Sequence, residues 1–265
     1  LVMRGVHVVT PVSGHLACGD SGAGKLEDVE VIARRAEEVL CAKRDLEGLR
    51  VLVTAGPSRE ALDPVRYISN RSSGKMGYSI AENAAKRGAK VTLLSGPVSL
   101  DAPKGVDIVP FLTTQELLDH ALELVDEQDI IIQAAAPADY RAQEIAPQKI
   151  KKQSGEPMTL TLVENPDVAA TIGQKKKASQ VFVGFAAETN DVIEHAQGKL
   201  MRKNLDMIVA NDVTRPGAGF DVDTNIVTLI SQSGVKALPL MSKADVAGHI
   251  LDYAFELYLE KANAQ

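Results

Sequence analysis

The sequence has few features of secreted, membrane or nucleic-acid-binding proteins. Its two cysteines, Cys18 and Cys41, are too few for a disulfide framework, which favours a reducing compartment. No apolar run is long enough to cross a membrane, and no secretory signal is visible. The formal net charge of -6 disfavours general affinity for nucleic acid, so an anionic ligand would need local clusters of Lys and Arg. We therefore expect a cytoplasmic protein with neither a membrane nor a nucleic acid as its partner.

Several short functional motifs are absent or incomplete. No G-x-G-x-x-G follows the first regular strand, so the dinucleotide fingerprint of a nicotinamide-dependent oxidoreductase is missing. No group of His, Cys and carboxylate residues has zinc-ligand spacing. Residues 19–25 (GDSGAGK) nearly match a phosphate-binding loop, but Leu26 stands where the magnesium-ligating Ser or Thr belongs. We expect no working phosphate loop there.

The chain of 265 residues is long enough for one large domain and an appendage. Residues 1–45 form a short N-terminal piece, with an expected glycine-rich loop at 14–24 and a helix at 26–40. That piece is too small to bury a core by itself. Residues 46–265 have a regular pattern and form the second expected domain. The first residue is Leu1 and not Met, so we expect a fragment of something longer.

Short apolar segments alternate with helical patterns throughout the second domain. The expected strands are residues 49–55, 90–94, 106–111, 130–135, 181–185, 207–210 and 226–230. Expected helices cover residues 74–87 and 114–125, with others around Val168, His195 and Val246. This alternation predicts an α/β fold, a three-layer, Rossmann-like, doubly wound and mostly parallel sheet. Ligands bind such sheets at the carboxyl ends of the strands, here after Ala55, Ala135, Phe185 and Ala210.

One segment, residues 140–160, breaks the alternating pattern. It is polar and rich in lysine, and it follows the central apolar strand directly. A long irregular insertion in that place is typical of a lid or a binding loop. Lys149, Lys151 and Lys152 could bring an ammonium group over a triphosphate or an acyl phosphate. The alternative is a solvated run of charge, which is the commoner case for an isolated cluster.

Three further segments carry groups suited to a phosphorylated ligand. Ser72, Ser73 and Gly74 stand at an expected helix start, where backbone N–H groups and the helix dipole favour an anion. Arg71 and Lys75 add positive charge there, although an ordinary serine cap gives the same pattern.

The other two segments follow expected central strands. Residues 133–140 combine small residues with Asp139, which could accept hydrogen bonds from a ribose or an amine, although a simple turn explains them equally well. In residues 184–189, Phe185 could stack on a base. Lys199 and Lys203 share one face of the next helix and could reach one phosphate chain, unless that face is only solvated.

Several long motifs, in order, resemble one family. They are residues 56–77 (GPSREALDPVRYISNRSSGKMG), 134–140 (AAAPADY), 146–152 (APQKIKK), 165–168 (NPDV), 184–189 (GFAAET), 203–206 (KNLD) and 210–213 (ANDV). Together they are similar to bacterial phosphopantothenoylcysteine synthetase over about residues 46–257. Residues 13–25 (SGHLACGDSGAGK) resemble the end of the flavin-dependent decarboxylase that is fused upstream of this synthetase in bacteria.

The resemblance implies a ligase of coenzyme A biosynthesis. The reaction joins 4'-phosphopantothenate to L-cysteine with CTP and Mg²⁺, through an acyl-cytidylate, and releases pyrophosphate and CMP. Such chemistry needs positioning and neutralisation of phosphate charge more than acid–base groups, which suits a sequence rich in Lys and poor in His at these motifs. The resemblance also implies a homodimer with the site near its interface. It implies FMN only in the full bifunctional protein, so this chain is not expected to decarboxylate by itself.

Site residues carry over from the family motif by motif. Lys149 takes the position of the activating lysine, Asn70 that of the asparagine needed to consume the acyl-cytidylate, and Cys18 that of the decarboxylase's proton donor. The implied CTP contacts are Gln133, Ala134, Ala135, Asp139, Lys149, Pro166, Asp167, Val168, Ala169, Phe185, Lys199 and Lys203. The implied phosphopantothenate contacts are Asn70, Arg71, Ser72, Ser73 and Gly74. One departure from the family pattern, Pro137, is expected to stiffen the nucleotide loop and to leave Asp139 in place.

The residues themselves leave three questions open. A nucleotide-sensing module without turnover and a nicotinamide-dependent oxidoreductase remain alternatives to the ligase. No spacing distinguishes CTP from ATP, and the magnesium ligands stay unassigned because phosphates and water can supply most of them.

Overall fold

The structure is a computed structural model, and it describes residues 6, 8–15, 21–40, 43–152, 155, 157–188, 192–212, 219 and 221–264. The chain divides into two compact units, residues 1–44 and 45–265. Each unit is described by itself below.

The first unit contains an antiparallel pair, β1 (Val12–His15) and β2 (Ser21–Lys25), followed by α1 (Val29–Leu40). The expectation of a glycine-rich loop over residues 14–24 was wrong where these strands lie, since Gly14 pairs with Gly22. Glycine has a low intrinsic strand propensity, and here pairing with the partner strand overrides it. Because β2 is an extended strand, residues 21–25 do not form the loop that cradles a phosphate. Cys18 and Cys41 lie outside the described residues.

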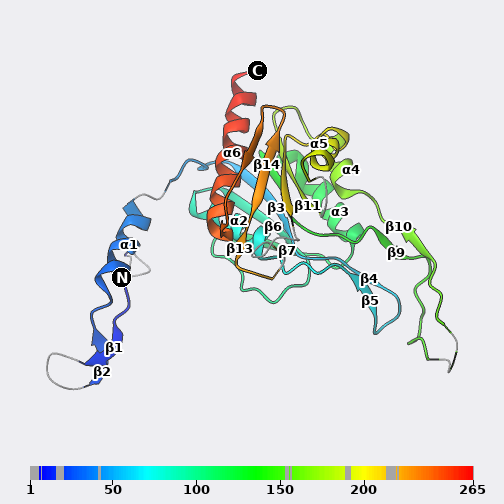
Figure 1. The fold of residues 1–265 in the computed structure, drawn as a ribbon, viewed down its shortest axis with the longest axis horizontal. Helices are drawn as coiled ribbons and strands as arrows, with labels where there is room; N and C mark the ends of the chain where they lie inside the picture. The colour runs from blue at the N-terminus through cyan, green and yellow to red at the C-terminus, as the bar shows by residue number, and fades with distance from the viewer. Residues whose placement is uncertain are drawn as a thin grey trace. The chain divides into compact units, whose positions relative to one another are not determined.

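An eight-stranded sheet forms the centre of the second unit (Figure 1). Its order is β15 (Val235–Ala237), β14 (Val227–Ser231), β12 (Met207–Asp212), β11 (Val181–Glu188), β8 (Ile130–Gln133), β3 (Arg50–Ala55), β6 (Lys90–Ser95) and β7 (Val106–Pro110). The six strands from β12 to β7 are parallel to one another. Strand β14 is antiparallel to β12, and β15 is antiparallel to β14.

The six parallel strands have the Rossmann order. If they are counted along the chain from β3, their order across the sheet is 3-2-1-4-5-6. In this order the chain leaves β3 toward one edge and then returns to place β8 on its other side. The switch point between β3 and β8 opens a crevice beyond the carboxyl ends of the strands. The predicted doubly wound, mostly parallel fold is confirmed.

Helices cover both faces of the sheet. One face carries α2 (Lys75–Lys86) and α6 (Lys243–Asn263), and the other carries α3 (Thr114–Leu124), α4 (Val168–Lys175) and α5 (Val192–Arg202). A short 3-10 helix, η2 (Val125–Glu127), follows α3. No helix among the described residues combines the length and the apolar character needed to span a bilayer.

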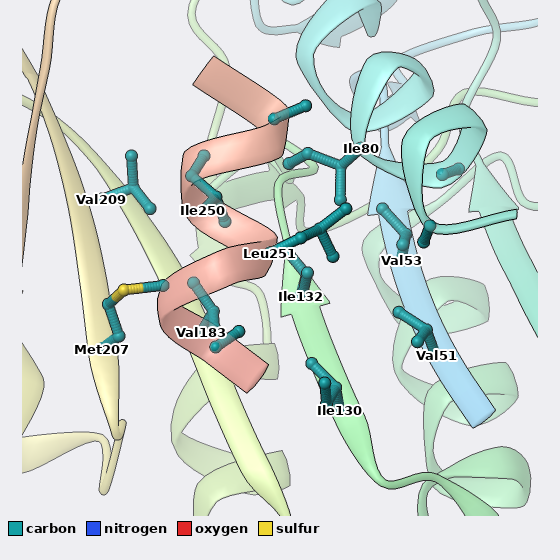
Figure 2. Close-up of a cluster of buried hydrophobic side chains, with 14 of the residues drawn as sticks. Val51, Val53, Ile80, Ile130, Ile132, Val183, Met207, Val209, Ile250 and Leu251 are labelled. Atoms are coloured by element: carbon teal, nitrogen blue, oxygen red, sulfur yellow. The ribbon is translucent and has the colours of Figure 1, made fainter. Parts of the chain in front are cut away.

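Alternation along each strand divides the core into two layers. Val51 and Val53 of β3 face α2 and α6, whereas Leu52 faces the opposite helices. Figure 2 shows Ile250 and Leu251 of α6 packed over the strands on the first face. The strands are buried on both faces, which explains why they appear in the sequence as nearly continuous apolar runs.

Three small antiparallel pairs project from this frame. They are β4 (Arg59–Ala61) with β5 (Tyr67–Ser69), β9 (Tyr140–Ala142) with β10 (Leu162–Glu164), and β13 (Thr224–Asn225) with β16 (Met241–Ser242). Residues 143–161 lie between β9 and β10, and we call residues 140–164 the arm (Figure 1). The irregular insertion expected at 140–160 is therefore the greater part of the arm.

Candidate active site

Two pockets lie at the carboxyl edge of the sheet, where a Rossmann order places ligands. The α4 pocket, of about 350 Å³, is lined by the start of α4, the ends of β8 and β11, and Lys203. The α2 pocket, of about 540 Å³, is lined by the start of α2, the loop after β8, the end of β12 and the start of α6. Ala135, Pro137, Asp139 and Phe185 line both pockets. Two ligands bound in these pockets would meet at that shared ridge.

The two pockets belong to opposite faces of the sheet. On β8, Ile130 and Ile132 face α2 and α6, so Gln133 falls on the other face and lines the α4 pocket. On β12, Met207 and Val209 face α2 and α6, so Asn211 falls on that same face and lines the α2 pocket. The alternation of the strands therefore sends one amide into each pocket. In the described structure, Gln133 Oε1 and Asn211 Oδ1 are the buried side-chain polar atoms with no hydrogen-bond partner.

The α4 pocket combines a helix start with an ion pair. Asp167 caps α4 by accepting from Ala170 N at 3.0 Å, and the first helical residues, Val168 and Ala169, line the pocket. Lys203 Nζ lies 2.8 Å from Asp167 Oδ2. Partial burial opposes ionisation of Asp167, but the Lys203 ammonium and the backbone N–H groups outweigh it and lower the pKa of the carboxyl. A helix start with an adjacent ammonium suits a phosphate chain.

A buried polar network holds the wall of the α4 pocket. Ser58 Oγ accepts from Ala138 N at 2.9 Å and from Thr114 Oγ1 at 3.1 Å. Glu60 Oε1 accepts from Thr114 N at 2.9 Å. Asn165 Nδ2 donates to Ala138 O at 2.8 Å. These bonds connect four separate segments, so the loop after β8 is held in one position before any ligand arrives.

At the α2 pocket, the backbone takes a conformation that needs glycine. Gly74 is the N-cap of α2 with φ 77°, in the left-handed region, and no side chain caps the helix. The serine-cap alternative is therefore not what this helix start uses. A Cβ on Gly77 would lie 2.5 Å from Ala55 Cβ, so glycine lets the start of α2 lie directly against β3. Residues 72–77, at the start of α2, line the pocket, and a helix start of this kind favours an anion.

Asn70 connects the two loops that meet at the switch point. Its Nδ2 donates to Ala136 O at 3.2 Å and to Pro137 O at 2.9 Å. These two hydrogen bonds therefore join the loop after β3 to the loop after β8. Pro137 offers its carbonyl to this contact, and Asp139 lies on the ridge that both pockets share.

Two lysines hold Gly219 and residues 221–223 beside the α2 pocket. Lys243 Nζ donates to Gly219 O at 3.1 Å and to Val222 O at 2.6 Å. Lys75 Nζ donates to Asp223 Oδ1 and to Asp221 O, each at 2.8 Å. The hydrogen bond to Asp223 and the nearby carboxylates raise the pKa of Lys75, whereas burial, together with the charge of Lys75, lowers the pKa of Lys243.

Most of the predicted site residues converge on these pockets. Those that line at least one of them are Asn70, Arg71, Ser72, Ser73, Gly74, Gln133, Ala134, Ala135, Asp139, Pro166, Asp167, Val168, Ala169, Phe185 and Lys203. Lys199 lies on α5, one helical turn before Lys203, which follows the last residue of that helix. Lys199 lines neither pocket. Lys149 also lines neither pocket.

Lys149 is exposed on the arm, next to a tether at Ile150. Ile150 N donates to Asp63 Oδ2 at 3.1 Å, and Ile150 O accepts from Arg66 Nη1 at 2.9 Å. Lys151 and Lys152 line a separate surface hollow with Arg66. The arm is thus fixed at a defined point, and Lys149 does not reach the pockets of its own chain in this conformation.

The sequence analysis missed four residues of the site. Asn165 and Asn211 stood within quoted motifs and Thr114 began an expected helix, but nothing in their spacing singled them out. Lys243 gave no signal, because a lysine at a helix start far along the chain looks like a solvated side chain. Its contacts are with Gly219 and Val222, which come to it only in the folded chain.

The described residues contain no group of three or more His, Cys, Asp or Glu side chains that could hold a metal ion. The protein therefore offers no cage of its own for Mg²⁺ in the part that the structure describes. Mg²⁺ commonly keeps its waters and binds through substrate phosphates with one or two carboxylates. Asp139, on the ridge, is a carboxylate open to such an ion.

Fold and site together define a Rossmann-type α/β protein with two adjoining pockets at the carboxyl edge of its sheet. Residues 46–257 match the family described as "DNA/pantothenate metabolism flavoprotein C-terminal domain", and the chain belongs to this family. The family resemblance expected from the motifs is confirmed.

Comparison with known proteins gives both sequence and structural relatives. The chain is 48% identical over 263 residues, 98% of its length, to the coenzyme A biosynthesis bifunctional protein CoaBC of Escherichia coli (strain K12). It spans 62 to 65% of the length of the curated relatives it matches. A solved C-terminal domain of CoaBC is 39% identical with a TM-score of 0.71, over 82% of this chain and 100% of that one. A Cab2 variant in complex with phosphopantothenate-cysteine, 15% identical with a TM-score of 0.67 over 91% of this chain and 97% of that one, shares the fold.

Proposed function

We propose that this chain is a phosphopantothenate–cysteine ligase, which joins 4'-phosphopantothenate to L-cysteine with CTP in coenzyme A biosynthesis. The observation that carries the proposal is the pair of pockets on opposite faces of the sheet, which meet at Ala135, Pro137, Asp139 and Phe185. A ligase of this kind must bring a nucleotide and an acid together at their reacting ends. Relatives named for coenzyme A biosynthesis, and a same-fold protein bound to phosphopantothenate-cysteine, support the choice of substrates.

The nucleotide occupies the α4 pocket in this proposal. Phe185 stacks on the base, and the start of α4 with Lys203 binds the phosphates. The acid occupies the α2 pocket, where its phosphate lies at Ser72, Ser73 and Gly74 and its carboxylate points to the ridge. CTP rather than ATP is proposed because the motifs resemble the bacterial form of the family.

The reaction then proceeds in two displacements at the ridge. A carboxylate oxygen of the acid attacks the α-phosphorus of CTP, and pyrophosphate leaves with the electrons of the broken P–O bond. The amine of cysteine attacks the acyl carbon of the resulting acyl-cytidylate, loses a proton and expels CMP. Mg²⁺ neutralises phosphate charge when it is bound with the nucleotide. The protein supplies position and fixed positive charge, which suits a site with no histidine among its lining residues.

Lys149 is the activating ammonium in this proposal, and a second copy of the chain delivers it. Lys149 lines neither pocket of its own chain, and the arm exposes Ile145, Met158 and Leu162, each with more than two-fifths of its surface accessible. Several exposed apolar side chains on one segment support a protein partner. A homodimer in which each arm reaches over the pockets of the other copy accounts for both features.

The remaining expectations belong to the whole protein. Residues 1–44 are proposed to be the end of a flavin-dependent decarboxylase domain, with Cys18 as its proton donor and FMN bound only by the full-length protein. The location is proposed to be cytoplasmic. None of these features is needed for the ligase step.

Release of pyrophosphate tests the function. The chain should release pyrophosphate from CTP only with phosphopantothenate present, and should form phosphopantothenoylcysteine only when cysteine is added. Lys149→Gln should abolish pyrophosphate release while the chain remains folded. Asn70→Asp should permit the acyl-cytidylate to form and should stall its transfer to cysteine. Normal turnover by either variant would contradict the role given to that residue.

Two other functions would give different results. A nucleotide-sensing module would bind CTP and release no pyrophosphate under any combination of substrates. A nicotinamide-dependent oxidoreductase would bind NAD(P), which the ligase proposal does not expect.

A further inference from the structure

The turn that follows α5 contains an asparagine in a backbone conformation that usually requires glycine. Among the described residues other than glycine, Asn204 alone has a positive φ, of 50°. Asn204 N donates to Met201 O at 3.3 Å. Leu205 N donates to Leu200 O at 2.9 Å, which completes the hydrogen-bond pattern of a Schellman cap. Glycine is the usual residue at this position of such a cap, so the side chain of Asn204 calls for an explanation.

The amide of Asn204 connects this turn to α4. Its Nδ2 donates to Gly173 O at 2.7 Å. A Cβ on Gly173 would lie 1.9 Å from Lys203 O, so the turn lies directly against α4 and only glycine permits the contact. The backbone of residues 203–204 is therefore placed against α4 both by a hydrogen bond and by close packing.

Lys203, which precedes Asn204 in the turn, brings its ammonium to the other end of the same helix. Lys203 Nζ lies 2.8 Å from Asp167 Oδ2, at the N-cap of α4, whereas Gly173 lies in the last turn of α4. A lysine side chain is a long and flexible stem, so its ammonium has a defined position only where its backbone is fixed. The contact at Gly173 fixes that backbone.

We propose that Asn204 is a positioning residue for the nucleotide, because its amide holds the backbone of Lys203 against α4 and so directs the ammonium to the phosphates at the start of that helix. This inference rests on the proposed function, since it takes the occupant of the α4 pocket to be a nucleoside triphosphate. Asn204 lines neither pocket, so it acts through Lys203 and does not touch the ligand. Gly173 has a part in the same arrangement, because its missing side chain leaves room for Lys203 O.

An ordinary helix cap is the alternative role for Asn204, and a glycine variant distinguishes the two roles. Asn204→Gly keeps the left-handed conformation and the Schellman hydrogen bonds, and it removes only the donor to Gly173 O. A residue that only ends α5 predicts wild-type kinetics for this variant. A positioning residue predicts that the KM for CTP rises about threefold to tenfold, as expected for one lost hydrogen bond, while the KM for phosphopantothenate stays within about twofold.

Gly173→Ala tests the same contact from the side of α4. The added methyl group must push the turn away, because Lys203 O occupies its place. The KM for CTP should rise at least as much as in Asn204→Gly. Gly198→Ala is the matched control, since a Cβ on Gly198 of α5 would meet nothing within 4 Å beyond its own helix backbone and chain neighbours. This control should leave both KM values unchanged.

A double-mutant cycle shows whether Asn204 acts through Lys203. In chains that already carry Lys203→Met, Asn204→Gly should change the KM for CTP by less than about twofold, because no ammonium remains to be positioned. An unconnected structural role predicts the same factor with and without Lys203.

The pKa of the Asp167 carboxyl reports on Lys203 without any substrate. Partial burial opposes ionisation of Asp167, and the hydrogen bond and charge of Lys203 help to lower its pKa in spite of this burial. Carboxyl NMR titration of Asn204→Gly should therefore find a higher pKa for Asp167 than in the wild type.

Four results would overturn the inference. They are an unchanged KM for CTP in Asn204→Gly, an equal rise in the KM for both substrates, fully additive effects with Lys203→Met, and an unchanged pKa of Asp167. If Gly173→Ala does not fold, Asn204→Gly decides alone. If the wild-type chain forms no product at all, the proposed function fails separately, and the titration of Asp167, which needs no substrate, then decides whether Asn204 positions Lys203.

Discussion

Lys203 shows how a single side chain can serve both the fold and a ligand. It pairs with Asp167, the cap of α4, and it lines the α4 pocket beside that helix start. Both side chains remain partly exposed, so solvent screens the pair and its contribution to folding is small. Its proposed contribution to an anionic ligand is larger, because Lys203 and the start of α4 line the same pocket.

Replacing Lys203 with Met should raise the KM for CTP roughly 10- to 100-fold, as expected for loss of a charge-assisted hydrogen bond. The pKa of Asp167 should also rise toward its ordinary value, because the hydrogen bond and charge of Lys203 lower it. Steady-state kinetics measures the first effect and carboxyl NMR titration the second. Lys90→Met, at the amino end of β6 and so at the opposite edge of the sheet, should change neither.

The sequence alone could identify site residues only where chemistry and motif agreed. Arg71 to Gly74 were picked out because they stand at an expected helix start, and Asp139 because it follows an apolar strand; the family motifs then sorted them by substrate. Asn211 looks like an ordinary strand end in the sequence, and Gln133 was named only through the family resemblance. Their unpaired oxygens exist only after the helices have packed over both faces of the sheet.

At the scale of elements, the arm is held at Ile150 by one carboxylate, Asp63. Asp63 accepts from the backbone N–H groups of Val65 at 2.7 Å, Arg66 at 2.8 Å and Ile150 at 3.1 Å. Desolvation opposes its ionisation, but these three hydrogen bonds and the charge of Arg66 outweigh it and lower the pKa. The contribution of ionised Asp63 to the stability of the folded chain is therefore fully present above its ordinary pKa of 3.8. It is lost as the pH falls through the lower pKa that Asp63 has in the folded chain.

Asp63→Asn should loosen the arm without unfolding the domain. The amide cannot accept at both positions, so the bond from Ile150 N is lost, and hydrogen exchange at Ile150 should quicken. If the arm delivers Lys149, the rate of pyrophosphate release should fall while the KM for CTP stays near its original value. Unchanged exchange at Ile150 would contradict the tether. The same loosening should appear in the unsubstituted chain below pH 3.8 and not at neutral pH.

The long C-terminal helix stabilises the sheet through its buried face. Leu251 of α6 is fully buried and lies among strand residues of the first core layer (Figure 2). Leu251→Ala should lower the free energy of unfolding by about 2–5 kcal/mol, through lost transfer energy and the cavity left behind. Denaturant unfolding measures this, and a loss below about 0.5 kcal/mol would mean that the helix is not packed as described.

Elements were predictable where a periodic apolar pattern was long. The parallel strands, α2 and α3 were located within about three residues, because buried strands and amphipathic helices leave regular patterns. The pair β1–β2 was missed because its glycines resemble a loop. The antiparallel strands β14 and β15 gave no sign of their direction, since direction is set by connections and not by composition.

At the scale of the whole molecule, the proposed function needs two chains for each active site. In the proposed homodimer, the pockets belong to the sheet of one copy and Lys149 belongs to the arm of the other. The motifs could not show this, because residues adjacent in a motif need not serve the same site.

Mixing two inactive variants tests the shared site. Lys149→Gln lacks the ammonium, and Asn70→Asp lacks the pocket amide, so each pure dimer should be inactive in the full reaction. In mixed dimers one of the two sites has both residues intact. Random exchange should therefore restore about a quarter of the original activity. Failure to recover activity, with mixed dimers demonstrated by mass, would place Lys149 in the site of its own chain.

The central claim is that the acid is activated on the α-phosphorus of CTP before cysteine attacks. Phosphopantothenate labelled with ¹⁸O in both carboxylate oxygens tests it directly, since one of those oxygens bridges to phosphorus in the acyl-cytidylate. After turnover with CTP and cysteine, mass spectrometry should find one ¹⁸O in CMP, one in phosphopantothenoylcysteine and none in pyrophosphate. Unlabelled CMP would contradict the account, and label in pyrophosphate would show activation at a different phosphorus.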